Sequence, residues 1–487
     1  MLKLEDLLKA TGAEILQKGA EVFSGVSIDS RTIKKDELFI ALQGERFDGH
    51  DFLTAALGVG AGAVIGRTLE KMAAFEKVMD FEKTGGIQKS ILLVEDPLKA
   101  LQGISHHIRM GRPEMPVVGV TGSNGKTTTK ELAAAVLGQK FKVLKSSGNF
   151  NNQIGLPLNL CRLGPGHGAA VLEMGASRPG DIRELCDIAM PTHGIITNVG
   201  ESHLEGFTKG AGGSGADPME TLIDTKLDLA RAAGAVVYNA DDARLSAAVN
   251  REFKGGKAKK LLSFGIGEGA DFRARGIVME RSSTSFEFLA KGRKAARVKL
   301  SAAGLFNVYN ALAAAAAGLL FDISLEDAAR AIMGFGGVPM RYEVMEKAGA
   351  LILSDVYNAN PASMEEALKE LARLRGGRAV AVLGDMLELG PYAEEAHRRL
   401  GVRLAGLSVD VFIAVGPMMA LACEEFKSAK GQKFKKGGLA IACADSVSAA
   451  EALMKDLRAG DTVLVKGSRG TRMERVLERM GDMHVGK

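Results

Sequence analysis

The sequence predicts an α/β protein of three domains, and three observations lead to this. Its 487 residues exceed what one hydrophobic core usually organises. Short apolar runs alternate with helical patterns, as in parallel sheets. A glycine-rich stretch, TGSNGKTTT at 121–129, lies between a predicted strand and a predicted helix. We therefore expect a small α/β N-terminal domain (1–96), a central domain with a P-loop-type, mononucleotide-binding parallel sheet (97–337), and a C-terminal domain with a doubly wound, Rossmann-like sheet (338–487).

In the N-terminal region, the first 16 residues carry acids within an apolar pattern and predict an amphipathic helix rather than a signal peptide. A helix followed by a Gly-Gly turn is expected over 71–89. Short β-rich runs predict strands at 25–33, 37–44, 61–66 and 90–96.

The central region begins with a predicted helix at 98–110 and a strand at 116–120, directly before the glycine-rich stretch. The segment 208–218 is rich in glycine and predicts a mobile loop. Further strands of the parallel sheet are expected at 141–146, 169–175, 193–200 and 234–242.

The C-terminal region repeats the strand-helix rhythm, with helices expected at 361–375 and 393–404. Three polar motifs, DVYNANP, GDMLELG and KGSRG, each follow a predicted strand. Ligands of doubly wound sheets collect at the carboxyl ends of strands, so these motifs predict a binding site. The strands are expected at 351–358, 378–386, 409–416, 439–446 and 461–468.

The composition is that of a soluble globular protein, with 46% hydrophobic and 25% charged residues. A net charge of +5 is mild for this length and gives no case for a nucleic-acid partner. The sequence has no apolar run of about 18 residues, so no membrane span is predicted. Free thiols in a reducing cytoplasm are expected, because no paired spacing relates Cys161, Cys186, Cys423 and Cys443.

The glycine-rich stretch departs from the usual phosphate-loop pattern G-x-x-x-x-G-K-[ST], because Val120 stands where the first glycine is expected. Glycines still allow backbone N–H groups to approach phosphate oxygens, and the following helix adds a favourable dipole. Lys126 can reach the β- and γ-phosphates, and the hydroxyl of Thr127 can bind Mg²⁺. The competing interpretation is a glycine-rich turn with a chance lysine.

Three residues could complete a phosphoryl-transfer site. Glu173 ends an apolar strand, as a magnesium-binding carboxylate would, although it also suits the start of a helix. His203 follows another strand, where a lone histidine is more often structural. Lys226 lies in a helical pattern and, from that pattern alone, is an ordinary surface lysine.

Six motifs occur in an order that resembles the Mur ligases, the ATP-dependent amide-forming enzymes of peptidoglycan precursor synthesis. They are TGSNGKTTTKE, NFNNQIGLP, LEMGASRPGDI, TNVGESHLEGF, YNADD and FNVYNALAA. The short phosphate loop is typical of this family. The motifs DVYNANPASM and LGDMLELG, with His397 after them, resemble the member that adds D-Ala-D-Ala, and the D-N-P-R motif of a relative is absent. The stretch 28–52 is similar to the family's uridine-nucleotide-binding domain.

The resemblance implies an ADP-forming carboxylate–amine ligase that joins D-Ala-D-Ala to UDP-MurNAc-tripeptide in the cytoplasm, as a monomer. It implies that Lys126, His203, Lys226 and Arg341 are catalytic. ATP would be bound by Gly122, Ser123, Asn124, Gly125, Lys126, Thr127, Thr128, Asn307, Asn310 and Arg341. Two magnesium ions would be bound by Thr127, Glu173, His203 and Lys226, the last as a carbamate. The other substrates would contact Ser30, Arg31, Asn149, Asn151, Asn152, Asn358, Asn360, Asp385, Glu388 and Lys466.

Two positions depart from the family pattern: Phe306 replaces a histidine on the adenine side, and Met340 replaces the glycine before Arg341. Glu388 and His397 are the candidates for the base that deprotonates the incoming amine. Three alternatives stay open: a folylpolyglutamate-type ligase, an ATP-hydrolysing switch or motor, and a binding protein without activity.

Overall fold

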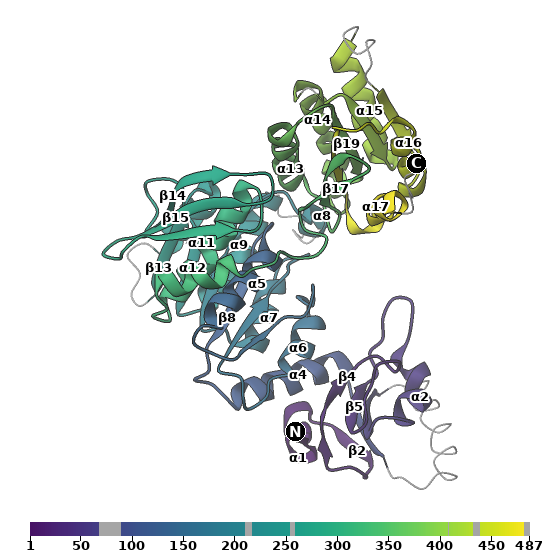
Figure 1. The fold of residues 1–487 in the computed structure, drawn as a ribbon. Coiled ribbons are helices and arrows are strands. Elements are labelled where there is room, and N and C mark those ends of the chain that lie inside the picture. Colours follow the sequence, from purple (N-terminus) through teal and green to yellow (C-terminus); the bar gives the residue numbers. More distant parts are fainter. Residues whose placement is uncertain (68–88, 210–216, 254–258, 408, 432–438, 482–487) are drawn as a thin grey trace.

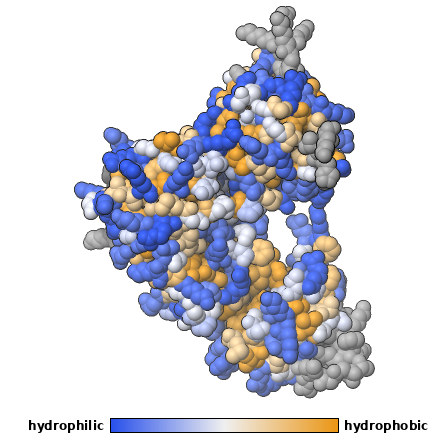
Figure 2. Space-filling model, viewed as in Figure 1, coloured by the Kyte–Doolittle hydropathy of each residue, from blue (hydrophilic) through white to orange (hydrophobic). Residues whose placement is uncertain are grey.

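Three large sheets follow one another along the chain in the computed structural model, and two short strands of the N-terminal domain form a further small sheet (Figure 1). It describes residues 1–67, 89–209, 217–253, 259–407, 409–431 and 439–481. The N-terminal and C-terminal domains lie on either side of the central domain. Figure 2 shows that the C-terminal domain packs on the central domain. An opening lies between the C-terminal domain and the N-terminal domain in this view. The predicted three-domain α/β class is confirmed.

The N-terminal sheet has the order β2-β7-β6-β5-β4, with all neighbours parallel except β2. The helix predicted over the first 16 residues is too long. It is limited to α1 (Leu4–Thr11), because Gly12 takes a left-handed φ of 63° and ends it. The elements are β1 (Leu2–Lys3), β2 (Glu14–Gln17), β3 (Val22–Phe23), β4 (Gly25–Ser27), β5 (Glu37–Ile40), η1 (Gly49–Phe52), α2 (Leu53–Leu57), β6 (Gly62–Gly66) and β7 (Ser90–Val94).

The central sheet has nine strands in the order β16-β15-β14-β13-β12-β11-β8-β10-β9. The strands from β9 to β14 in this order are parallel, and β15 and β16 extend the sheet in antiparallel pairing. The five predicted strands correspond to β8 to β12, whereas β13 to β16 were not predicted. The strands are β8 (Val117–Thr121), β9 (Val143–Lys145), β10 (Ala169–Glu173), β11 (His193–Ile196), β12 (Ala235–Asn239), β13 (Lys260–Gly265), β14 (Phe272–Met279), β15 (Thr284–Ala290) and β16 (Ala296–Leu300).

The helices of the central domain cover both faces of this sheet (Figure 1). Seven residues of α11, Ala311 to Ala317, are buried, and the small side chains let α11 pack closely on α5. The helices are α4 (Pro97–Met110), α5 (Lys126–Leu137), α6 (Gly155–Leu160), α7 (Asp181–Ala189), α8 (Leu204–Lys209), α9 (Pro218–Ala232), α10 (Ala243–Phe253), α11 (Leu305–Leu319) and α12 (Leu325–Met333).

The C-terminal sheet has the order β17-β18-β22-β19-β20-β21 and is parallel except for the edge strand β17. The carboxyl ends of β18, β19 and β22 carry the three polar motifs. The elements are β17 (Glu343–Lys347), β18 (Ala350–Asp355), α13 (Pro361–Leu374), β19 (Ala379–Gly384), η2 (Gly390–Tyr392), α14 (Ala393–Gly406), β20 (Val411–Val415), α15 (Pro417–Lys430), β21 (Leu439–Cys443), α16 (Ser446–Asp456), β22 (Thr462–Lys466), η4 (Arg469–Thr471) and α17 (Glu474–Gly481).

Two predicted segments fall largely outside the described residues. The helix and turn expected at 71–89 lie there except for Lys89, and so does most of the loop expected at 208–218. Of that loop, Thr208 and Lys209 end α8 and Pro218 begins α9. In the described part of the chain, no helix combines the length and apolarity needed to cross a membrane.

Candidate active site

A cavity of about 1100 Å³ lies between the central and C-terminal domains. The phosphate loop between β8 and α5 forms one wall, and the ends of β18 and β22 form the opposite one. Strand β8 lies between β10 and β11, so the chain order changes direction beside the loop. Such a switch point is where α/β sheets bind ligands.

At both glycine positions of the phosphate loop, neighbouring atoms leave no room for a Cβ. Gly122 has a φ of 148°, and a Cβ there would lie 1.9 Å from Oγ1 of Thr197. Gly125 has a φ of 81°, and its Cβ would lie 2.3 Å from Oδ1 of Asn310. The backbone N–H of Asn124 donates to Oδ1 of Asn198 at 2.9 Å. The loop is thus held rigidly against its neighbours, with Val120 simply completing β8.

Lys126 folds back over the loop that it follows. Its Nζ donates to the carbonyls of Gly122 at 2.8 Å and Ser123 at 3.2 Å. Burial lowers the pKa of Lys126, while Glu173 raises it and Arg341 lowers it further. An anion in the cavity would add to the counter-charge that Glu173 supplies to this ammonium. Thr127, 8% exposed, and Thr128 also line the cavity.

Glu173 ends β10 beside the loop, paired in register with Val120. Its Oε1 accepts a hydrogen bond from Nδ2 of Asn151 at 2.8 Å. Its Oε2 is buried and has no hydrogen-bond partner among the described residues. A buried carboxylate oxygen without a donor is costly, and a hard cation would satisfy it. The environment of Glu173 therefore fits magnesium.

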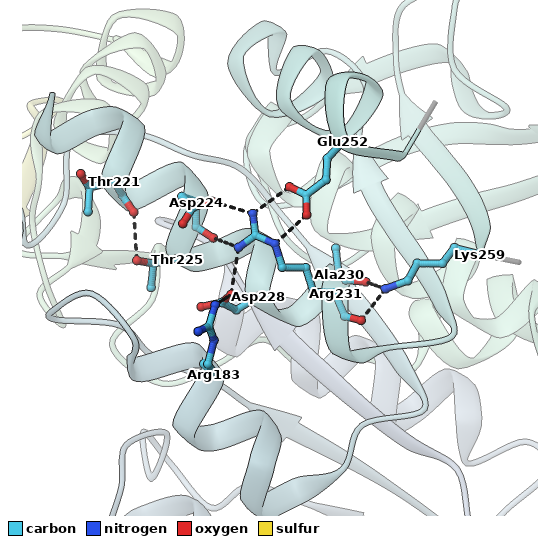
Figure 3. Close-up of polar contacts among 9 residues, drawn as sticks. All are labelled: Arg183, Thr221, Asp224, Thr225, Asp228, Ala230, Arg231, Glu252 and Lys259. Carbon is cyan, nitrogen blue, oxygen red and sulfur yellow. Dashed lines mark hydrogen bonds and ion pairs between the residues drawn. The ribbon is translucent and has the colours of Figure 1, made fainter. Parts of the chain in front are cut away.

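Lys226 is only 2% exposed, so the interpretation from pattern alone, a surface lysine, is wrong. Burial, with a smaller contribution from Lys126, lowers the pKa of its amine well below the usual value. The other face of α9 is anchored by Arg231, whose guanidinium pairs with Asp224, Asp228 and Glu252 (Figure 3). The helix is thereby fixed with its amine in the interior.

His203 and Glu388 meet across the domain boundary, with Nδ1 and Oε2 2.5 Å apart. The hydrogen bond from His203 lowers the pKa of Glu388. Both line the cavity. No group of three His, Cys, Asp or Glu side chains with metal-binding geometry occurs in the described residues. His203, expected to bind metal, is here engaged by the acidic side chain expected to bind substrate.

Arg341 reaches the phosphate loop from the segment that joins the two domains. Its Nη2 donates to Oγ1 of Thr127 at 3.2 Å, and its guanidinium lies 3.8 Å from the ring centroid of Tyr357. Phe306 makes no polar contact of the kind a histidine would. Its ring packs edge-on against Tyr342, with centroids 5.1 Å apart.

Further predicted residues gather around this cavity. Oδ1 of Asn310 accepts a hydrogen bond from Oγ1 of Thr129 at 3.2 Å, and its Nδ2 donates to Oδ1 of Asn307 at 3.2 Å. Lys466 is 1% exposed; its Nζ pairs with Asp355 and donates to the carbonyl of Asn358 at 2.9 Å. The remaining lining residues from the predicted set are Asn149, Asn151, Asn152 and Asn360.

Six predicted residues do not line the cavity, and two of them, Gly122 and Lys226, are described above. The carboxylate of Asp385 instead accepts the backbone N–H of Met419 at 2.6 Å, at the start of α15. His397, a candidate base, is fully buried; Nε2 accepts the N–H of Met386 and Nδ1 contacts the carbonyl of Ala393. Both ring nitrogens are occupied, so that candidacy is wrong. The other two, Ser30 and Arg31, belong to the N-terminal domain, and Arg31 pairs with Asp29.

Tyr357, Glu370 and Arg373 also line the cavity, although none of them was among the predicted site residues. Tyr357 lies inside the DVYNANP motif, and its aromatic character was the available signal. Glu370 and Arg373 lie in α13 one turn apart, where they resemble an ordinary surface ion pair.

The sequence and the fold are similar to those of known proteins. Three family models match: "Mur ligase family, catalytic domain" over 22–109, "Mur ligase middle domain" over 120–318, and "Mur ligase, glutamate ligase domain" over 340–469. The UDP-N-acetylmuramoyl-tripeptide–D-alanyl-D-alanine ligase of Bacillus subtilis is 34% identical, over 94% of this chain and 93% of the relative. The chain belongs to the Mur ligase family.

Other Mur ligases agree. The ligase of the same name from Escherichia coli is 31% identical over 95% of both chains. MurF from Acinetobacter baumannii superposes with a TM-score of 0.83 at 29% identity, covering 99% of each chain. MurF ligase from Thermotoga maritima in complex with ADP gives a TM-score of 0.76 at 32% identity, over 94% of this chain and 96% of that one.

Proposed function

We propose that this Mur ligase uses ATP to join D-Ala-D-Ala to the terminal carboxylate of UDP-MurNAc-tripeptide. The observation that carries the proposal is the shared cavity. The phosphate loop and Arg341 lie on one side of it, and the motif residues Asn358 and Lys466 lie on the other. The relatives named for this reaction match over nearly the whole chain.

The chemistry begins from a poor acyl donor, because a carboxylate would have to expel oxide. A carboxylate oxygen of the tripeptide attacks the γ-phosphorus of ATP, and ADP leaves, giving an acyl phosphate. The amine of D-Ala-D-Ala attacks the acyl carbon, and the tetrahedral intermediate expels inorganic phosphate and loses a proton. Lys126 and Arg341 balance the negative charge of the transferring phosphoryl group.

Positioning is the chain's other contribution. The two-domain cavity holds both reactants and limits water, which would hydrolyse an acyl phosphate. Asn358, whose carbonyl is fixed by Lys466, and Asn360 are proposed to face the incoming dipeptide. Ser30 and Arg31 are proposed to hold the uridine nucleotide on the N-terminal domain. Glu388 stays the candidate base, because its carboxylate is exposed at the cavity.

Magnesium would be held by Glu173, whose Oε2 lacks a partner among the described residues, and by the hydroxyl of Thr127. When bound, it would neutralise charge on the phosphate oxygens. We further propose that Lys226 becomes a carbamate. A lowered pKa favours the neutral form of its amine, and only a neutral amine adds to carbon dioxide. The product is an anion, which would be attracted to the ammonium of Lys126.

Phosphate release from ATP tests the proposal. With UDP-MurNAc-tripeptide and magnesium present, release should require D-Ala-D-Ala, and mass spectrometry should find the pentapeptide product. Release that ignores the dipeptide would favour an ATP-hydrolysing switch. Release driven by glutamate and a folate would favour the folylpolyglutamate-type alternative.

A further inference from the structure

The side chain of Arg341 is held from two directions at once. Its guanidinium lies 3.8 Å from the ring centroid of Tyr357, and Nη2 donates to Oγ1 of Thr127 at 3.2 Å. Thr127 belongs to the central domain, whereas Tyr357 follows β18 in the C-terminal domain. The ring and the hydroxyl therefore set the direction in which the arginine points.

The backbone around Arg341 is fixed as well. The N–H of Tyr357 donates to the carbonyl of Met340 at 3.2 Å, and the N–H of Met340 donates to Glu343 at 2.9 Å. Met340 and Tyr342 both take left-handed φ angles, 64° and 47°. Such angles persist only where the surroundings determine the conformation. Tyr357 thus touches this segment through its backbone and through its ring.

The ring offsets a real cost. Lys126 and Arg341 are two cations at one loop; burial is the main cause that lowers the pKa of Lys126, and the charge of Arg341 lowers it further. A free arginine would turn away from Lys126 and would lose rotamer freedom on binding phosphate. The face of an aromatic ring attracts a guanidinium and limits its rotation before the ligand arrives.

We propose that Tyr357 is a positioning residue that holds the Arg341 guanidinium ready for the phosphate chain of ATP. The inference rests on the proposed function for the identity of the nucleotide. Tyr357 acts through Arg341, so its ring matters only for nucleotides whose phosphate chain reaches that arginine. We assign this role to the ring and not to the phenol hydroxyl.

Binding of ATP and of AMP to the full-length protein, measured by displacement of a fluorescent ATP analogue, tests the inference. Tyr357→Leu should weaken ATP binding roughly tenfold and leave AMP binding unchanged, while Tyr357→Phe should bind ATP like wild type. In an Arg341→Ala background, Tyr357→Leu should cause no further loss. Phe253→Leu is the matched control. The ammonium of Lys259 lies 5.1 Å from the ring centroid of Phe253, and Phe253 does not line the cavity.

Equal losses for ATP and AMP would overturn the inference in favour of a contact between the ring and the base or sugar. Additive losses in the double variant, or a Tyr357→Phe variant as weak as Tyr357→Leu, would also overturn it. The readout is separate from that of the proposed function. Wild-type protein that binds ATP but releases no dipeptide-dependent phosphate would contradict the ligase reaction alone.

Discussion

Asn124 in the phosphate loop and Asn360 at the start of α13 exchange two side-chain hydrogen bonds, at 2.8 and 3.3 Å. The two residues belong to different domains. Asn360 also caps α13, because its Oδ1 accepts the N–H of Ser363 at 2.9 Å. One carboxamide therefore connects the nucleotide-binding loop to the helix behind the dipeptide motif.

Asn360→Ala should reduce both stability and ligase activity. Loss of the cap costs about 1 kcal/mol in the free energy of unfolding, and loss of the contact with Asn124 frees the two domains to shift. Asp445→Ala is the matched control, since Asp445 forms the capping box of α16 away from the cavity. Urea denaturation should show similar losses for both variants, and only Asn360→Ala should lower kcat. Equal activity in the two variants would show that the interdomain contact has no role.

Gly122→Ala should abolish most nucleotide-dependent activity. Its Cβ would lie 1.9 Å from Oγ1 of Thr197, so the loop must shift. A displacement of about 1 Å at a reacting site can cost on the order of a hundredfold in rate. Gly460→Ala is the control, because Gly460 also has a positive φ, 86°, but a Cβ there meets no atom within 4 Å. Wild-type ATP turnover in the Gly122→Ala variant would disprove the close fit.

Lys226→Met should inactivate the enzyme and yet stabilise it at pH 7 in buffer free of carbon dioxide. The pKa of Lys226 is lowered in the folded state, so between that lowered pKa and 10.5 the unfolded chain binds more protons than the folded chain. Wild-type stability should therefore rise with pH across that window, by at most about 1.4 kcal/mol per pH unit. The variant lacks this slope, so its advantage should shrink as the pH rises.

Chemical denaturation at several pH values measures that slope. Lys455→Met, an exposed replacement on α16, should change stability little at any pH. Parallel pH profiles for wild type and Lys226→Met would contradict the buried neutral amine. Partial recovery of Lys226→Ala activity with small carboxylic acids would support the carbamate, and wild-type activity in that variant would exclude it.

Met340→Gly should cost less stability than Met345→Gly. Both methionines pack against the same core of the C-terminal domain. Met340 has a left-handed φ of 64°, which costs a non-glycine residue roughly 1–2 kcal/mol, whereas Met345 lies in β17. We expect the two losses to differ by about 1 kcal/mol in thermal unfolding. A greater loss for Met340→Gly would mean that its side-chain packing outweighs the backbone strain.

Local patterns were enough to predict the phosphate loop and most parallel strands. The signal for the loop is the Gly125-Lys126 pair between an apolar run and an amphipathic helix, and all of it lies within about a dozen residues. The strands β13 to β16 were missed, although Phe286 and Phe288 of β15 alternate with polar neighbours as strand residues do. That alternation is a local signal, so β15 could have been predicted from the sequence.

Contacts between domains were beyond sequence reasoning. His203 and Glu388 are 185 residues apart, and their pairing depends on how two separately folded domains dock. The burial of Lys226 and His397 likewise depends on helices packed on them from elsewhere in the chain. A helical pattern gives the face on which a side chain lies. It does not say whether another element covers that face.

Transfer of labelled oxygen tests the central claim, that the γ-phosphate passes to the peptide carboxylate. UDP-MurNAc-tripeptide labelled with oxygen-18 in the terminal carboxylate is incubated with ATP, magnesium and D-Ala-D-Ala, and the released phosphate is analysed by mass spectrometry. The acyl-phosphate route predicts one labelled oxygen in each phosphate released with each pentapeptide formed. Unlabelled phosphate would contradict it, because the γ-phosphate would then have been transferred to water.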